Sequence, residues 1–171
     1  MTKKNMQSVC VEGTKLLKIP TTVVFAALQD RKRLEKLVPG CRYIDKTEYK
    51  KSTSEVLVNL DNKECLFLNE HWTTCVEPSS KISISVIGNG GPAGRFTADF
   101  DIIIKSEENT TGFYYSVNAN FYWKSVVFSK KSIESTMTKI IEMFLNNLQQ
   151  QYFRETDDPF NLFLTIKKLI N

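Results

Sequence analysis

Hydrophobic periodicity constrains the fold of this chain more than any other feature of its sequence. Between residues 41 and 123, apolar and polar side chains alternate with a period of two, which is the pattern of strands that bury one face. The alternating segments are separated by short breaks that carry turn residues, such as Asp61-Asn62 and the glycine-rich run 88–92. Short turns between long strands predict hairpins, and hairpins in series predict an antiparallel meander.

The alternation predicts seven strands in all, one of them before the first helix. In that first strand Val9, Val11 and Leu17 share one parity, and in the last two strands phenylalanine and isoleucine dominate one parity. Each strand therefore has one apolar face, and another apolar element must cover that side of the sheet. The predicted strands are residues 8–19, 41–48, 51–60, 64–76, 81–88, 93–106 and 111–123.

The covering element is a long amphipathic helix late in the chain. From Ser132, a predicted N-cap, apolar residues recur at intervals of three and four as far as Tyr152. About twenty residues of helix extend roughly 30 Å, which is enough to cross a curved sheet. Two shorter helices, 23–28 and 31–38, follow the first strand. Thr21 and Thr22 are predicted to cap the first helix, and Pro39-Gly40 ends the second. The predicted fold class is therefore α+β, with a curved seven-stranded antiparallel sheet wrapped around one long helix.

The end of the chain is predicted to form a separate unit. A polar stretch at 154–158 predicts a hinge, and Pro159 suits the first position of a short amphipathic helix. We therefore divide the chain into a sheet-and-helix domain, 1–153, and a hinge with a C-terminal helix, 154–171. Three roles are open for this helix: docking on its own domain or on a second copy in a homodimer, binding a partner protein, and peripheral contact with a membrane.

Composition excludes several classes of protein. A net charge of +4, from 23 Lys and Arg against 19 Asp and Glu, is too small and too evenly spread to indicate nucleic-acid binding. The N-terminus has no apolar run of signal-peptide length, and no stretch approaches the ~20 apolar residues that span a bilayer. Four cysteines without a C-x-x-C pair then indicate reduced, mostly buried thiols. We expect a cytoplasmic protein, with peripheral membrane contact as the alternative.

A conventional active site cannot be assembled from this sequence, and we predict no catalytic residue, metal site or cofactor. The single histidine, His71, shares the parity of Cys75, but four residues of extended strand separate them by about 13 Å. Glu70 has the parity of Leu68 and Trp72, and is therefore predicted to point toward the apolar side of the sheet. A bulge that turns Glu70 back to water is the alternative.

Two motifs of this chain resemble the CoxG-like family, named after the G-subunit of carbon monoxide dehydrogenase. Residues 24–30 (VFAALQD) followed by 37–41 (LVPGC) are similar to the opening signature of that family. Residues 88–94 (GNGGPAG) are similar to its glycine-rich turn before the penultimate strand. The resemblance covers about residues 7–150, and it implies the helix-grip fold of the START-related superfamily.

The resemblance also implies an apolar cavity between the sheet and the long helix, which this superfamily uses for lipids, quinones, polyketides or hormones. From the residues alone, an ordinary filled core is the alternative. The expected lining, chosen by strand parity and helical spacing, consists of Trp72, Ile84, Phe96, Phe100, Phe113, Tyr115, Val117, Met137, Ile141 and Phe144, with Glu70 as its polar member.

Three functions are compatible with these expectations. The first is a non-catalytic module that binds or carries a hydrophobic small molecule. The second is a cyclase- or hydratase-like enzyme that uses the same pocket, with Glu70 or Tyr115 as proton donor. The third, implied by the family, is an accessory protein that assembles a molybdenum hydroxylase or recruits it to the membrane, through its surface and its C-terminal helix.

Overall fold

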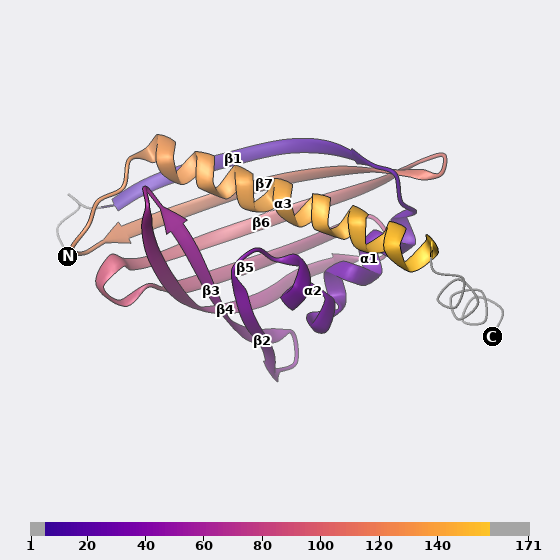
Figure 1. Cartoon of the computed structure of the whole chain (residues 1–171). Helices are drawn as coiled ribbons and strands as arrows, with labels where there is room; N and C mark the ends of the chain where they lie inside the picture. Colours follow the sequence, from indigo (N-terminus) through magenta and orange to yellow (C-terminus); the bar gives the residue numbers. More distant parts are fainter. Residues whose placement is uncertain (1–5, 158–171) are drawn as a thin grey trace.

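The fold is a curved antiparallel sheet with one long helix lying across its concave side (Figure 1). The computed structural model describes residues 6–157. The seven strands form one sheet in the spatial order β1-β7-β6-β5-β4-β3-β2, which confirms the predicted meander and the α+β class. The elements are β1 (Met6–Leu17), α1 (Thr21–Gln29), α2 (Arg31–Leu37), β2 (Cys41–Glu48), β3 (Lys51–Leu60), β4 (Lys63–Glu77), β5 (Lys81–Asn89), the short 3₁₀ helix η2 (Gly91–Ala93), β6 (Gly94–Glu107), β7 (Thr110–Trp123) and α3 (Lys130–Asp157).

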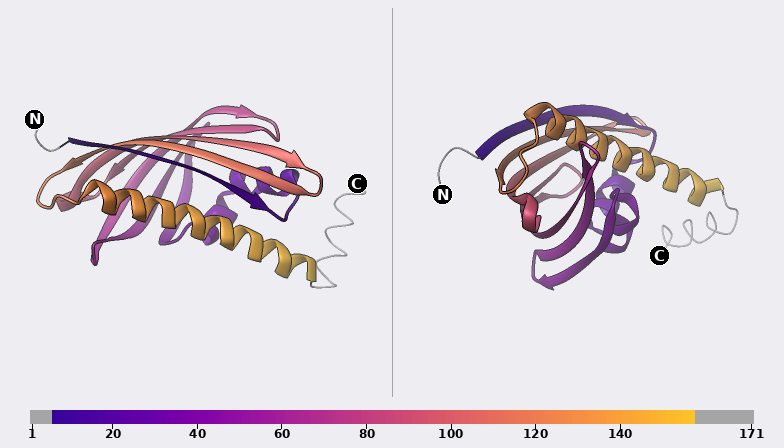
Figure 2. Two further views of the ribbon diagram at one scale, coloured as in Figure 1. Left: turned by 90° about the horizontal axis from the view of Figure 1, so that it is seen from above. Right: turned by 60° about the vertical axis from the view of Figure 1, so that its left-hand side comes forward.

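Pleating sorts the side chains of the sheet into an inner face toward α3 and an outer face. On β6 and β7 the inner residues are those that the alternation predicted, and they pair in register, with Phe96 opposite Phe121 and Phe100 opposite Val117. Helix α3 lies on the same side of the sheet as α1 and α2 (Figure 2). All the helices therefore cover a single face of the sheet.

Two separate apolar cores hold the helices against the sheet. The first lies where β7 ends and α3 begins, and the rings of Phe121 and Trp123 stack there with 5.0 Å between their centroids. The second lies at the other end, where α1, α2 and the last turns of α3 pack around Phe113. Tyr115 and Ile141 touch both cores without being fully buried in either. The middle of the interior is therefore less well covered than its two ends.

The caps of the helices are set by single polar side chains. Asp30 accepts a hydrogen bond from the backbone N–H of Arg33 (3.3 Å), which starts α2 immediately after α1. At the start of α3, the hydroxyl of Ser129 accepts from the backbone N–H of Ser132 (3.1 Å). Ser129 therefore caps α3, and the predicted cap, Ser132, lies inside its first turn.

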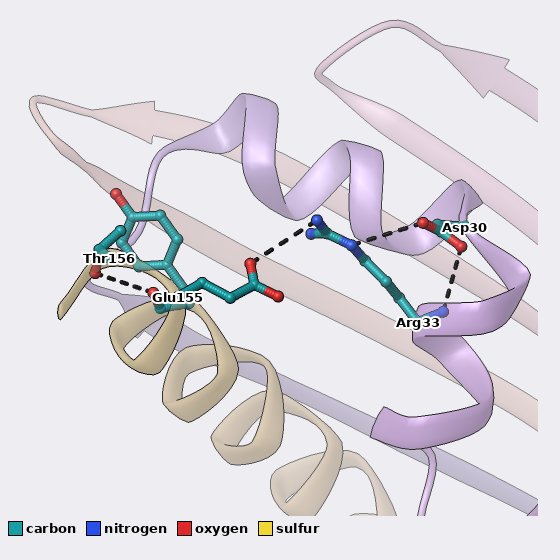
Figure 3. A network of polar contacts seen from close by, with 5 residues as sticks. Asp30, Arg33, Glu155 and Thr156 are labelled. Atoms are coloured by element: carbon teal, nitrogen blue, oxygen red, sulfur yellow. Dashed lines mark hydrogen bonds and ion pairs between the residues drawn. The ribbon is translucent and has the colours of Figure 1, made fainter. Parts of the chain in front are cut away.

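Helix α3 continues through most of the predicted hinge. It runs without a break to Asp157, because the arginine and glutamate that follow residue 153 are good helix formers and polarity alone does not end a helix. In Figure 3, Arg33 of α2 lies between Asp30 and Glu155, with its Nη2 atom 3.9 Å from the Glu155 carboxylate. The predicted C-terminal helix lies outside the described residues, so its docking, partner and membrane roles stay predictions.

A substitution at Gly40 tests how closely the backbone packs beside β3. Its φ is +74°, and a Cβ there would lie 2.0 Å from the carbonyl oxygen of Leu57. Gly91 is the matched control, since its φ is +58° but nothing lies within 4 Å of a Cβ. We expect Gly91→Ala to lower the free energy of unfolding by about 1 kcal/mol, the cost of the left-handed backbone. Gly40→Ala should lower it by roughly 3 kcal/mol, because backbone must also move. Urea unfolding of both variants measures this, and equal losses would contradict it.

Candidate functional site

Helix α3 is bound to the β1 edge of the sheet and lies farther from the β2 edge. The backbone N–H of Lys18 donates to Oε1 of Gln149 (2.9 Å), and Nζ of Lys15 donates to Oδ1 of Asn146. An α-helix is about 10–12 Å wide, whereas strands about 4.8 Å apart make a seven-stranded sheet roughly 29 Å wide. One helix therefore leaves part of the concave face uncovered, on the side of β3.

A groove of about 760 Å³ lies between α3 and β3, and we call it the α3–β3 groove. At one end, Ser132 Oγ donates to Oδ1 of Asp61 in the β3–β4 turn (2.5 Å). Toward the other, Asn147 Nδ2 donates to the carbonyl oxygen of Leu37 in α2 (3.0 Å). Between these contacts, one face of α3 stands opposite β3 across the groove. The lining residues are Pro39, Gly40, Leu57, Val58, Asn59, Asp61, Asn62, Ser129, Lys131, Ser132, Ser135, Thr136, Lys139, Ile140 and Met143.

Most side chains predicted to line a cavity form a half-buried apolar band between the two cores. Phe113 and Val117 differ, because they are fully buried and belong to the cores themselves. Val58 both lines the groove and packs against the first core, so the groove adjoins that core, but none of the predicted lining residues lines the groove itself. The apolar band consists of Ile84, Phe96, Phe100, Tyr115, Met137, Ile141 and Phe144.

Two predicted lining residues, Trp72 and Glu70, do not belong to this interior, and that part of the prediction is wrong. Glu70 is exposed, and its carboxylate lies 3.3 Å from Nζ of Lys51. The same ammonium group lies over the Trp72 ring, 5.4 Å from its centroid. Trp72 pairs with Ser85, whose hydroxyl donates to Asp99 on the outer face. Both residues therefore belong to the outer face of β4.

The prediction failed here because β4 carries apolar residues on both faces. Phe67 is buried on the inner face, whereas Leu68 is 52% exposed on the outer face. A bulge does occur in β4, but it lies between Thr73 and Cys75, beyond Glu70. It leaves Cys75 opposite Ser83 of the outer face, away from the inner side chains of this strand.

Sequence reasoning missed a group of polar side chains on the inner face of β3 and β4. Within it, Ser54 pairs with Asn69 and Ser52 pairs with His71 in the strand register. The signal was present in β3, where the serines have the same parity as the apolar residues that follow them. The inner position of these serines can be inferred only when the pairing of β3 with β4 is known. We call this group the polar strip, and it consists of Ser52, Ser54, Asn69, His71 and Thr73.

Burial shifts the pKa of several groups in this region. It lowers the pKa of His71 below its usual value, which favours the neutral imidazole. Burial raises the pKa of the Tyr115 phenol, and the nearby charge of Glu142 raises it further. Burial also raises the pKa values of the Cys41 and Cys65 thiols, so neither is activated as a nucleophile. The four cysteines are free, and only Cys65 is fully buried, so the prediction of mostly buried thiols is wrong.

The described residues offer no metal-binding cluster and no membrane-spanning helix. Within residues 6–157, no three His, Cys, Asp or Glu side chains come together as a metal would require. None of the helices in the same part of the chain is long and apolar enough to cross a bilayer. The site is thus an apolar band with a groove on one side and a polar strip on another.

Solved structures that superpose on this chain share the helix-grip fold. A conserved protein from Geobacillus kaustophilus superposes with a TM-score of 0.79 at 19% identity, over 87% of this chain and 97% of that one. Ara h 8.0201 gives a TM-score of 0.62 at 12% identity, over 86% and 99%. An aromatase/cyclase from Streptomyces sp. R1128 gives 0.57 at 11% identity, over 88% and 96%. At these identities the likeness establishes the fold alone, which is the helix-grip fold.

The family follows from the sequence itself. The model of the CoxG family, described as the G-subunit of carbon monoxide dehydrogenase, matches residues 13–152. This chain belongs to that family, as the two motifs indicated. No curated protein matches the chain.

His71 makes the stability of this site depend on pH in a defined direction. Because burial lowers its pKa, the unfolded chain binds the proton more tightly than the folded chain does. Its stabilising effect is therefore present above the unfolded pKa of about 6.5 and is lost as the pH falls below it. We expect the free energy of unfolding to decline less in His71→Gln than in the wild type between about pH 7.5 and 5.

Urea unfolding at several pH values measures that difference. His71 is the only histidine, so no second imidazole contributes to it. A constant offset between the two proteins across this range would show that the folded imidazole keeps its usual pKa.

Proposed function

We propose that this protein binds a hydrophobic small molecule, such as a lipid, a quinone or a polyketide-like compound, against the apolar band, and that it does so without catalysis. The observation that carries the proposal is the half-burial of inward-facing aromatic and aliphatic side chains between two well-packed cores. Such side chains are stabilised when a guest removes them from water. Met137, with its flexible thioether, lets the band adapt to different shapes.

The magnitudes favour binding of a modest apolar molecule. Each buried methylene group contributes about 0.8 kcal/mol, so a chain of about ten carbons gains roughly 8 kcal/mol. Association costs at least about 4 kcal/mol in lost freedom of motion, which leaves about 4 kcal/mol, enough for binding in the millimolar range. We expect such a molecule to enter from the groove of about 760 Å³, which lies beside the first core.

An accessory role beside a molybdenum enzyme is the second candidate, favoured by the family description. Exposed apolar side chains on the outer face of β4 and β5 support it, with Leu68 52% and Ile87 47% exposed. Such a surface suits a protein partner. Co-purification of a large dehydrogenase polypeptide with the tagged chain, lost in Leu68→Asp, would support this role.

The two candidate proton donors, Glu70 and Tyr115, do not favour the cyclase or hydratase alternative. Glu70 lies outside the interior, and the raised pKa of Tyr115 makes its phenol a weaker acid than usual. An aromatase/cyclase shares the fold, but the fold does not carry the activity with it.

The direct test of binding is native mass spectrometry of the purified full chain. We expect an adduct of a few hundred daltons that organic extraction removes and that N-phenyl-1-naphthylamine, an uncharged fluorescent probe, replaces. The extracted protein should be more stable to heat with the probe than without it, because a ligand that binds only the folded state stabilises it. Absence of both an adduct and probe binding would overturn the proposal.

A filling substitution locates the site. Ile141→Trp puts a larger side chain into the apolar band, so we expect it to weaken probe binding at least about tenfold while the fold is kept. The control is Ile103→Trp, which adds the same group to the outer face, where Ile103 is 41% exposed. Fluorescence titration measures both variants, and equal affinities would place the probe elsewhere on the molecule.

A further inference from the structure

The polar strip raises the question of which chemical group the interior is built to meet. The strip lies on the concave face of β3 and β4. On the same face of the sheet, strands β5, β6 and β7 carry apolar residues. Buried polar groups normally have hydrogen-bond partners, because an unpaired one costs about 1–3 kcal/mol. A buried acceptor in the strip without a partner therefore indicates a hydrogen-bond donor that arrives from outside.

Asn69 is the most demanding member of the strip. It is 8% exposed, and its Nδ2 donates to Ser54 Oγ (3.3 Å) and to the carbonyl oxygen of Phe67 (3.4 Å). Its Oδ1 is buried and has no hydrogen-bond partner among the described residues. A Cβ placed on Gly88 would lie 2.7 Å from that oxygen and 2.1 Å from the Phe96 ring, so Phe96 lies beside it.

The neighbouring members of the strip are half-buried, and their side chains also lack hydrogen-bond partners. Within residues 6–157, the side chains of Ser52, His71 and Thr73 make no hydrogen bond, and all three are only partly exposed. Together with Asn69 they provide hydroxyl and imidazole groups, which both donate and accept, beside a vacant carbonyl acceptor.

The strip borders the apolar band. Thr73 pairs with Ile84, and Ile84 pairs with Phe100, so the polar and apolar side chains are successive neighbours across the sheet. His71 pairs with Val86, and the next inner residue in that row is Ala98. The short side chain of Ala98 leaves space between the polar strip and the apolar band. A molecule on the band would thus reach the strip with one end.

We propose that the polar strip binds a hydroxyl group, and that the ligand of this protein is an uncharged amphiphile with a hydrocarbon body and one hydroxyl, such as a fatty alcohol or a phenol. A hydroxyl donates to a vacant acceptor such as Asn69 Oδ1 or a neutral imidazole nitrogen, and it accepts from a serine or threonine. This inference rests on the proposed function and specifies its ligand class.

The charges around the strip favour an uncharged group. Lys51 points to the outer face, where it contacts Glu70 and the Trp72 ring. Lys15 is on β1, at the opposite edge of the concave face, and donates to Asn146. No strip member carries a fixed positive charge. Lys46 of β2 pairs with Ser52 and lies on the same face, but it is exposed to solvent, whereas Asn69 is buried. A carboxylate buried at Asn69 without an opposite charge is strongly disfavoured.

The experiment compares three probes of equal chain length: 1-octanol, octyl methyl ether, which accepts but cannot donate a hydrogen bond, and octanoate. Because His71 is the only histidine, its imidazole signals in a ¹H–¹³C NMR spectrum report on the strip directly. We expect 1-octanol to bind the full chain at least about fivefold more tightly than either other probe and to shift the His71 signals, since only the alcohol satisfies the vacant acceptor.

Variants of the strip test whether the preference comes from these residues. His71→Phe and Ser52→Ala should each reduce the preference for the alcohol over the ether while octyl methyl ether still binds. Thr53→Ala, on the outer face beside Ser52, is the control and should keep it. His71→Gln retains hydrogen-bonding groups and should restore part of the preference, which separates a polar role from one of shape. Thermal unfolding checks that each variant is folded.

The outcomes separate this inference from the proposed function. If the alcohol and the ether bind equally and the His71 signals do not shift, the strip is no anchor, although the band still binds hydrocarbon. Tighter binding of octanoate would replace the hydroxyl with an acid and overturn the inference as well. If none of the probes binds the wild-type chain, the proposed function fails together with its ligand class.

Discussion

The structure depends on a mismatch of widths between one helix and the sheet that it covers. Seven strands present a concave face roughly 29 Å across, whereas a helix with its side chains is about 10–12 Å wide. Curvature brings the two edges of the sheet closer to the helix but does not remove the difference. Polar contacts from Lys15 and Lys18 bind α3 to the β1 edge, so the uncovered width lies on the side of β3.

The two apolar cores are the consequence of this mismatch. At one end the β7–α3 connection places Phe128 against Trp123 of β7, and at the other α1 and α2 provide the additional cover. No further element remains for the middle in the described part of the chain, so Tyr115 and Ile141 stay only half-buried there. The open region is thus a property of the topology and does not depend on a particular loop.

Sequence periodicity was sufficient for the fold but not for the site. Strands such as β6 have a clear contrast between phenylalanine or isoleucine and polar residues, so their inner faces are unambiguous without any partner strand. Strand β4 has Phe67 on one face and Leu68 on the other, and only its pairing with β3 and β5 identifies the inner one. Trp72 and Glu70 were misplaced for that reason, and the polar strip was missed for the same reason. A one-residue change of parity exchanges the two faces of a strand, so the error affects the residues of β4 that precede its bulge at Thr73 and Cys75.

The reversed pattern of β4 is itself an argument for function. From Leu68 onward this strand directs an exposed leucine and a tryptophan outward, and it directs Asn69, His71 and Thr73 inward. Exchanging these faces would bury more apolar surface and would remove a buried acceptor without a partner, so the observed order is not the most stable one for a closed core. Local departures from such rules are concentrated at functional sites, where stability is given up for binding. The departure in β4 occurs only where its inner face borders the half-buried band, which is where a ligand would supply both the missing apolar contacts and the missing hydrogen bond.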